Sequence, residues 1–213
     1  EKALDKEGGD EVNEISVVAR GLSEAIQLLA EKYHWVFTNV PYLARGKQDQ
    51  ELQEYLGQNY KAGKNDLATA FLSRCLEFCK EGGVVNNVLP QNWLFLTTYK
   101  TFREKLLRGH TLNLIARLGP KGFSTPMWDF NVQLLSLSHS QSTRDKLGSI
   151  KQEEWEHLIN GLDVSEYRSP HEKSGGLLGD EIKQVLQLKQ LENPDARIAL
   201  EENTDLPLLS KYA

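Results

Sequence analysis

Four consecutive residues, Asn39-Val40-Pro41-Tyr42, combine the groups needed to hold a flat ring that carries an amino group. They follow the short apolar run 35–38, which predicts a buried strand that ends at the motif. Pro41 fixes φ and forces a turn, so the Asn39 side chain and the neighbouring carbonyls project as hydrogen-bond acceptors. Tyr42 offers a flat face beside them. This set of groups suits a planar ligand with an exocyclic amine, such as a base flipped out of a duplex.

A simpler interpretation exists for the same four residues. Asn-x-Pro-Tyr is also an ordinary turn sequence, and Tyr42 could be a core side chain. Taken alone, so short a motif favours the turn. The elements around the motif therefore have to show whether it is a binding motif or an ordinary turn.

Helices and strands alternate along the first part of the chain. Apolar spacing predicts helices over 11–33, 66–80 and 99–107, and strands over 84–89, 112–118 and 132–138. The polar, glycine-containing residues 43–65 predict a long loop. The expected fold class is α/β, a parallel sheet finished by an antiparallel edge hairpin. Ligands of such sheets bind at the carboxyl ends of the strands, where the motif lies.

Residues 141–213 have a different character. Helices are expected over 152–161 and 180–191, with a turn-rich stretch over 163–179 between them. Core residues are sparse, so we expect this part to pack on the sheet or to lead into more protein.

The net charge of −5 arises in residues 144–213, which hold 14 acidic against 9 basic residues. Residues 99–122 carry one acid, Glu104, and six basic side chains: Lys100, Arg103, Lys105, Arg108, Arg117 and Lys121. Such a cluster can face nucleic acid, but it is more often a solvated helix face.

Cys75 and Cys79 are the only cysteines, four apart on an expected helix. That spacing makes a poor disulfide, and no His stands at ligand spacing, so we expect reduced core thiols and no metal site. No apolar run approaches the ~18–20 residues of a membrane span, and no signal region is visible at the start. We therefore expect a cytoplasmic protein with no membrane contact.

The order of these segments resembles the second half of the amino-group DNA methyltransferases that carry Asn-Pro-Pro-Tyr. The family's pattern is matched, after the motif, by the Asp66–Leu72 helix running into Leu76–Gly83, by Leu89-Pro90-Gln91-Asn92-Trp93-Leu94, and by Tyr99–Leu107. The resemblance covers roughly residues 15–140. Residues 39–48, 119–137, 159–163 and 208–213 are most similar to the adenine-specific methyltransferases of BREX phage-defence systems.

The resemblance implies a partial Rossmann-like methyltransferase sheet. Residues 11–140 would form the second half of the catalytic domain, and residues 141–213 a helical extension or linker towards a missing recognition region. The implied reaction transfers a methyl group from S-adenosylmethionine to N6 of a flipped adenine in double-stranded DNA. The implied biological setting is phage defence or restriction-modification.

Roles for the motif follow from the same resemblance. Asn39 and the carbonyl of Val40 or Pro41 would accept hydrogen bonds from adenine N6. Tyr42 would stack on the base, a contact worth ~1–3 kcal/mol.

Aromatic residues outside the motif complete the implied site. The other face of the base would be closed by Trp128 or, as a second choice, Phe123. Phe71 matches the residue that packs on the adenine ring of S-adenosylmethionine, although core packing explains it equally well. Trp93 is expected in the core.

Two departures from the family pattern limit what the chain can do alone. Val40 replaces the first proline, so the turn is less restricted before folding. The Gly-rich turn and the acid that hold the cofactor in this family are missing from the sequence. We therefore expect a fragment that is inactive alone and that needs the missing N-terminal half of the domain, or a second copy.

Two alternatives stand beside this interpretation. The chain could be a non-catalytic DNA-binding or assembly module that keeps the methyltransferase fold. It could also be an unrelated α/β domain, but then five ordered features would have to coincide.

Overall fold

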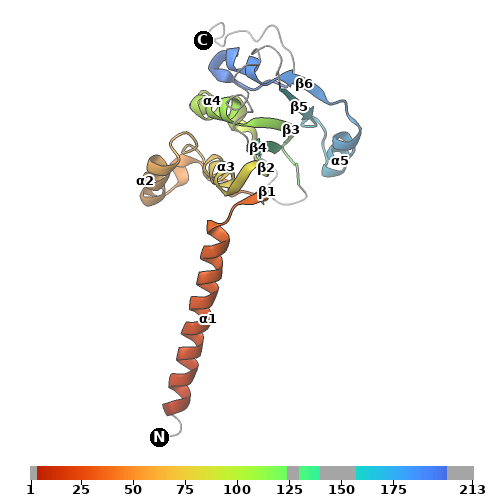
Figure 1. The fold of residues 1–213 in the computed structure, drawn as a ribbon. Helices are drawn as coiled ribbons and strands as arrows, with labels where there is room; N and C mark the ends of the chain where they lie inside the picture. Colours follow the sequence, from red (N-terminus) through yellow and green to blue (C-terminus); the bar gives the residue numbers. More distant parts are fainter. Residues whose placement is uncertain (1–3, 124–129, 140–156, 201–213) are drawn as a thin grey trace.

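The computed structural model describes residues 4–123, 130–139 and 157–200, with side chains from residue 15 onward. Six strands form one mixed sheet in the order β1-β2-β4-β3-β5-β6 (Figure 1). The strands are β1 Tyr33–Asn39, β2 Cys79–Pro90, β3 Thr111–Gly119, β4 Val132–His139, β5 Leu158–Asp163 and β6 Lys183–Leu186. The helices are α1 Leu4–Ala30, α2 Gln50–Asn59, α3 Leu67–Phe78, α4 Lys100–Gly109 and α5 Pro170–Gly179.

The expected α/β class is confirmed, and β1 pairs parallel to β2 with Asn39 opposite Val88. The hairpin of β3 and β4 is antiparallel, as expected, but it lies in the middle of the sheet. The reason is that β5 adds to β3 in parallel, and β6 adds to β5 in antiparallel orientation. The sheet thus continues beyond the part that the sequence pattern revealed.

The helices expected over 152–161 and 180–191 are wrong where the structure describes them, apart from the short 3-10 helix Leu188–Glu192. Residues 158–163 and 183–186 are strands, because pairing with β3 and with each other outweighs a weak helical pattern. The turn-rich stretch instead contains α5. Ser169 caps it by accepting from the Glu172 N–H, while the Glu172 side chain accepts from the Ser169 N–H. The sequence carried this signal, because Ser-Pro-His-Glu is a capping box with proline at the first helical position.

Two elements near the motif also differ from expectation. The expected loop 43–65 contains α2, whose N-cap Asp49 accepts from the Leu52 N–H at 2.8 Å. The strand β1 is not buried, because Trp35 and Phe37 are 69% and 62% exposed. Among the described residues β1 pairs with β2 alone, so it is an edge strand.

Side chains divide between the two faces of the sheet, as alternation along a strand requires. Leu135 and Leu137 of β4 join the main core with α3 and α4. Val132 and Leu134 face the other way, into a small cluster that also contains Leu177 of α5. Helices therefore cover both faces, with α3 and α4 on one and α5 on the other (Figure 1).

The two cysteines lie in the main core, as expected for thiols. Cys75 and Cys79 are both buried and free. Burial raises the pKa of both thiols. Across the described ranges, no group of three His, Cys, Asp or Glu side chains is placed to hold a metal.

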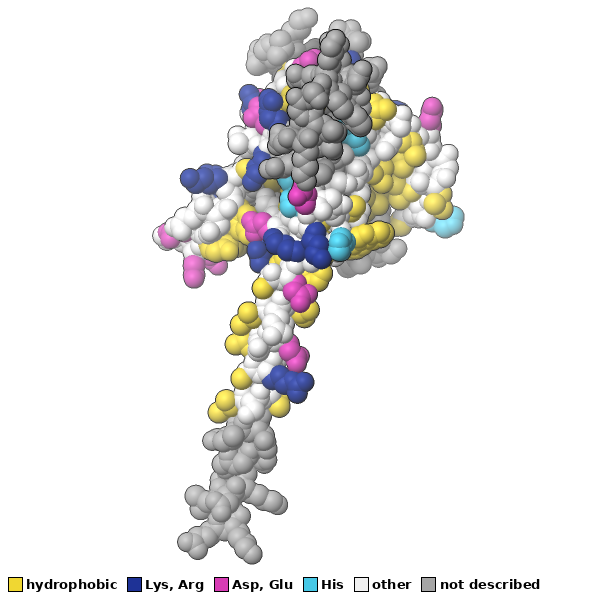
Figure 2. Space-filling view, viewed as in Figure 1, with side chains coloured by type: hydrophobic (Ala, Val, Ile, Leu, Met, Phe, Trp, Pro, Cys, Tyr) yellow, Lys and Arg dark blue, Asp and Glu magenta, His cyan; other side chains and the backbone are white. Residues whose placement is uncertain are grey.

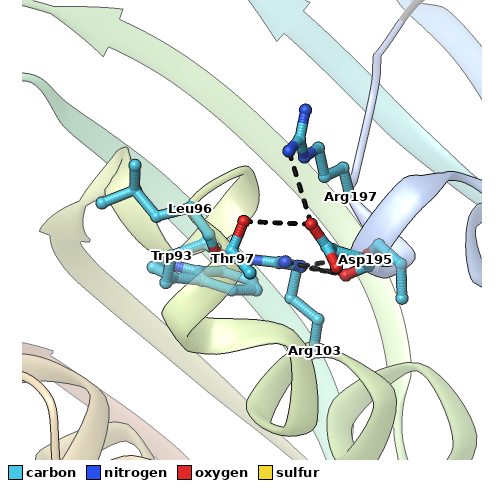
Figure 3. A network of polar contacts seen from close by, with 7 residues as sticks. Trp93, Leu96, Thr97, Arg103, Asp195 and Arg197 are labelled. Carbon is cyan, nitrogen blue, oxygen red and sulfur yellow. Dashed lines mark hydrogen bonds and ion pairs between the residues drawn. The ribbon is translucent and has the colours of Figure 1, made fainter. Parts of the chain in front are cut away.

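Arg103 of α4 is fully buried, so it does not belong to a solvated basic face. Figure 3 shows its guanidinium group pointing toward Asp195. Its Nη1 donates to the Trp93 and Leu96 carbonyls at 2.6 and 2.8 Å, and its Nη2 donates to the Asp195 carbonyl at 2.7 Å. Thr97 Oγ1 donates to the Asp195 carboxylate at 3.0 Å. This network ties residues 195–197 to the turn after β2.

Helix α1 projects from the body, and its apolar side chains face outward (Figures 1 and 2). The exposed set comprises Ile15, Val17, Val18, Leu22, Ile26, Leu28 and Leu29. Among the described residues, no helix has the length and apolar character that crossing a bilayer requires.

Candidate functional site

The candidate site lies at the edge of the sheet where parallel strands end. Asn39 closes β1, and Pro90 closes β2 opposite Val132, the first residue of β4. Gly119 closes β3 and also pairs with Val132. The carboxyl ends of β1, β2 and β3 therefore meet at one edge, which is where sheets of this kind bind ligands.

The motif residues adopt different degrees of burial at this edge. Asn39 and Pro41 are exposed, Val40 is 3% exposed in the main core, and Tyr42 is half-buried. The Val40 side chain therefore anchors the turn, while the Asn39 amide remains accessible. A simple turn with Tyr42 deep in the core is not what the structure shows.

The Tyr42 ring lies between the two apolar clusters and packs against both. Its hydroxyl donates to Asn39 Oδ1 at 3.2 Å, so the two polar groups of the motif face each other. Burial raises the pKa of Tyr42 to about 12, and the nearby Asp66 carboxylate adds to the rise. The hydroxyl is thus a neutral donor at physiological pH.

Phe130 is the aromatic residue that the structure places against Tyr42. The two ring centroids are 5.8 Å apart with an interplanar angle of 51°, and Phe130 is exposed. A base between two rings needs about 7 Å, twice the contact distance of stacked carbons. The rings pack directly on each other here, so they would have to separate before a base could enter.

The expected partners of Tyr42 were Trp128 and Phe123. Trp128 lies outside the described residues, and Phe123 is exposed. The sequence reasoning missed Phe130, although its place two residues before β4 was a usable signal. That strand begins beside Pro90 and Gly119, so a residue just before it must lie at the site edge.

The chain after the motif folds back on itself and holds the turn. The Leu67 N–H donates to the Leu43 carbonyl at 3.0 Å. Ala44 and Asp66 form an isolated antiparallel β-bridge. Gln48 Nε2 donates to the same Leu43 carbonyl at 2.9 Å. Asp66 caps α3 by accepting from the Ala68 N–H at 2.8 Å.

Phe71 lies on α3 and is 40% exposed, so it is not a core residue. Its exposed ring is available for contact with a flat ligand. Trp93 is in the core as expected, with its ring edge-on to Phe102 at 5.7 Å.

Comparison with known proteins decides the family. The model of the Eco57I restriction-modification methylase family matches residues 4–123, more than half of the chain. This chain belongs to that family. The match spans α1 to the end of β3 and includes the motif.

Curated relatives of this Eco57I-family chain agree with the expected resemblance to BREX methyltransferases. It is 32% identical over 104 residues to the adenine-specific methyltransferase PglX of Lacticaseibacillus casei (strain Zhang). The matched segment covers 49% of this chain. It is 31% identical over 96 residues to the adenine-specific methyltransferase BrxX of Escherichia coli O9:H4 (strain HS), which covers 45%. The matched segments make up only 9% and 8% of those proteins.

Solved structures share the fold. The protein chain of the DrdV–DNA complex is similar, with a TM-score of 0.57 and 18% identity. The match covers 80% of this chain and 19% of the DrdV chain. The methyltransferase subunit of a type I restriction-modification system from Streptococcus thermophilus is also similar, with a TM-score of 0.51 and 15% identity. The match covers 79% of this chain and 37% of that subunit. At such identities the likeness establishes the methyltransferase fold and nothing finer.

Proposed function

We propose that this chain supplies the base-binding part of a DNA methyltransferase that methylates adenine N6. One observation carries the proposal: the Asn39 amide is accessible at the ligand-binding edge beside the Tyr42 ring, in a chain of the Eco57I family. The DNA complex formed by DrdV, which shares the fold, supports DNA as the substrate; that the DNA is double-stranded is part of our proposal.

The motif residues act on the amino group of a flipped adenine. Asn39 Oδ1 and the carbonyl of Val40 or Pro41 accept its two N6–H bonds, which raises electron density on nitrogen and aims it. A bound sulfonium methyl donor would supply the methyl group and leave as the neutral sulfide, and N6 would lose one proton to solvent as it gains the methyl group. Tyr42 and Phe130 hold the ring between them, and Phe123 and Trp128 are further candidates for that contact.

S-adenosylmethionine supplies the methyl group in this proposal. The residues present fit only one side of it: Phe71 offers an exposed ring, and the described residues include no glycine-rich turn to hold the rest. We therefore expect isothermal titration calorimetry to detect no binding of S-adenosylmethionine by this chain alone. Micromolar affinity would contradict that expectation and reveal a second cofactor-binding region.

Residues 11–140 correspond, in this proposal, to the second half of the catalytic domain, and residues 141–213 lead towards a recognition region. The free edge of β1 and the apolar face of α1 offer a surface for the missing N-terminal half or for a second copy. An edge strand with exposed aromatic residues is a template for further strands.

Methyl transfer to adenine in duplex DNA tests the proposal, in a protein extended by the sequence upstream of residue 1. Asn39→Ala should lower kcat about 10²-fold or more, the usual effect of removing one aligned polar contact at a reacting centre. Asn59→Ala, on the exposed face of α2, is the matched control and should leave kcat unchanged. Full activity of Asn39→Ala would remove this residue from the mechanism, and an inactive extended protein would favour a non-catalytic module.

A further inference from the structure

Lys173 of α5 is a buried cation that the methyltransferase motif does not include. It is 2% exposed, and its Nζ donates to the Leu118, Val164 and Ser165 carbonyls at 2.6, 3.0 and 3.1 Å. An ammonium group has three protons, so each finds an acceptor. A charge is kept in the interior only where its hydrogen bonds are satisfied in this way.

The three carbonyls belong to two segments that meet at the candidate site. Leu118 stands just before the end of β3, where the chain leaves for Phe130, and Val164 and Ser165 follow β5. The segments touch closely at Gly119, which has φ +64°. A Cβ added there would come within 2.7 Å of the Ser165 Cβ. Lys173 therefore connects the end of β3 to the turn after β5 through hydrogen bonds to carbonyls of both segments.

The same two segments, together with Val132 of β4, form the apolar floor against which Tyr42 packs. Leu118, Val132 and Val164 make a small buried cluster, and the Tyr42 ring packs against it. Leu177 packs there too, four residues after Lys173 and thus on the same face of α5. Val164 and Leu177 come from the part of the chain beyond the methyltransferase match.

We propose that Lys173 is a positioning residue for Tyr42, acting through the apolar floor that it holds together. Residues 157–179 are then part of the site and not a connection beyond it. The inference rests on the proposed function only where the Tyr42 ring is taken to stack on a base. The position of the ring can be measured without DNA.

Fluorine NMR of the chain labelled with 3-fluorotyrosine provides that measurement. The Tyr42 resonance is assigned as the signal lost in Tyr42→Phe. Lys173→Met removes the ammonium that three carbonyls share, of which the Val164 carbonyl also accepts from the Tyr167 N–H at 3.3 Å. Val164→Ala removes part of the floor without touching the lysine. Both variants should move the Tyr42 resonance towards its value in the unfolded chain.

Arg103→Met is the matched control, because it removes another buried cation bound to backbone carbonyls, from the opposite face of the sheet. It should lower stability and leave the Tyr42 resonance in place. The proposal is overturned if Lys173→Met and Val164→Ala lower stability while Tyr42 keeps its resonance. It is equally overturned if Arg103→Met shifts the resonance as much as Lys173→Met does.

Base binding gives a second measurement, using the fluorescence of a duplex that carries mismatched 2-aminopurine. Lys173→Met should weaken the binding of this probe about tenfold, the size expected when one aromatic stacking contact is lost. This measurement uses the extended protein of the methylation assay. Should that protein, without substitutions, fail to bind the probe while the resonance shift is seen in the chain, the positioning role stands and the proposed function fails. Unchanged affinity in Lys173→Met, with the probe bound normally, counts against the positioning role.

Discussion

Tyr42 contacts both the polar and the apolar parts of the candidate site. Its ring touches both hydrophobic clusters and Phe130, and its hydroxyl donates to Asn39 Oδ1. The oxygen that would accept adenine N6 is therefore held by the protein's own hydroxyl. An amide oxygen has two lone pairs, so Oδ1 can accept from adenine N6 alongside that hydroxyl. A base still has to separate the Tyr42 and Phe130 rings, so a flipped adenine competes with that ring contact.

The raised pKa of Tyr42 predicts a loss of stability in alkali. The unfolded tyrosine ionises near pH 10, while burial raises the pKa of the folded one to about 12. The unfolded chain thus binds fewer protons between pH 10 and 12, and the free energy of unfolding falls as pH rises through that window. Urea unfolding at pH 8 and pH 11 should show a smaller drop for Tyr42→Phe than for the unaltered chain. An equal drop in both would show that Tyr42 does not contribute, and Tyr55→Phe, which alters an exposed ring, is the control.

The turn after β2 and residues 195–197 are held as a unit by one side chain of α4. Arg103 has no carboxylate hydrogen-bonded to its guanidinium among the described residues, and it donates instead to carbonyls on both segments. Asp195 and Ala196 have φ of +57° and +53°, conformations that cost free energy unless other contacts hold them. The network therefore stabilises an otherwise unfavourable backbone.

Replacing Arg103 tests how much this network contributes. Arg103→Met leaves several buried carbonyls without a donor, and the free energy of unfolding should fall by roughly 3 kcal/mol. Urea denaturation measures the change. Lys105→Met, on the exposed face of the same helix, should alter stability by less than about 0.5 kcal/mol. A loss of similar size in both variants would contradict a special role for the buried guanidinium.

The whole molecule exposes many apolar side chains on its first helix and its first strand. Figure 2 shows apolar side chains along α1, and the edge strand β1 adds exposed Trp35 and Phe37, whose ring centroids are 5.7 Å apart. Surfaces of this kind mark a site of contact with another protein segment. Their position beside the open edge of β1 favours strands added to the sheet as the occupant.

Charge placed on this surface should prevent association. We expect Trp35→Lys combined with Phe37→Lys to reduce concentration-dependent self-association, because lysine on an edge strand opposes pairing with another strand. Sedimentation velocity over a range of concentrations measures it. Tyr55→Lys, which changes an exposed aromatic residue on α2, is the control and should leave association unchanged. Persistence of the oligomer in the double variant would place the contact elsewhere.

Local signals in the sequence determined much of this protein. The apolar spacing of α3 and α4, the Asp66 cap and the β3–β4 hairpin follow from short-range patterns, and the ordered motifs indicated the methyltransferase family. The position of Asn39 at the end of a parallel strand followed from the same patterns. These features depend on residues close in sequence, so a local pattern is enough to specify them.

Contacts between distant segments decided the rest. Residues 158–163 became a strand because β3 offered a free edge, and Phe130 met Tyr42 because β4 begins where β1 and β2 end. Lys173 lies 55 residues from the Leu118 carbonyl that it binds. No local pattern encodes such pairs, because their free energy arises only when the folded chain brings donor and acceptor out of water together.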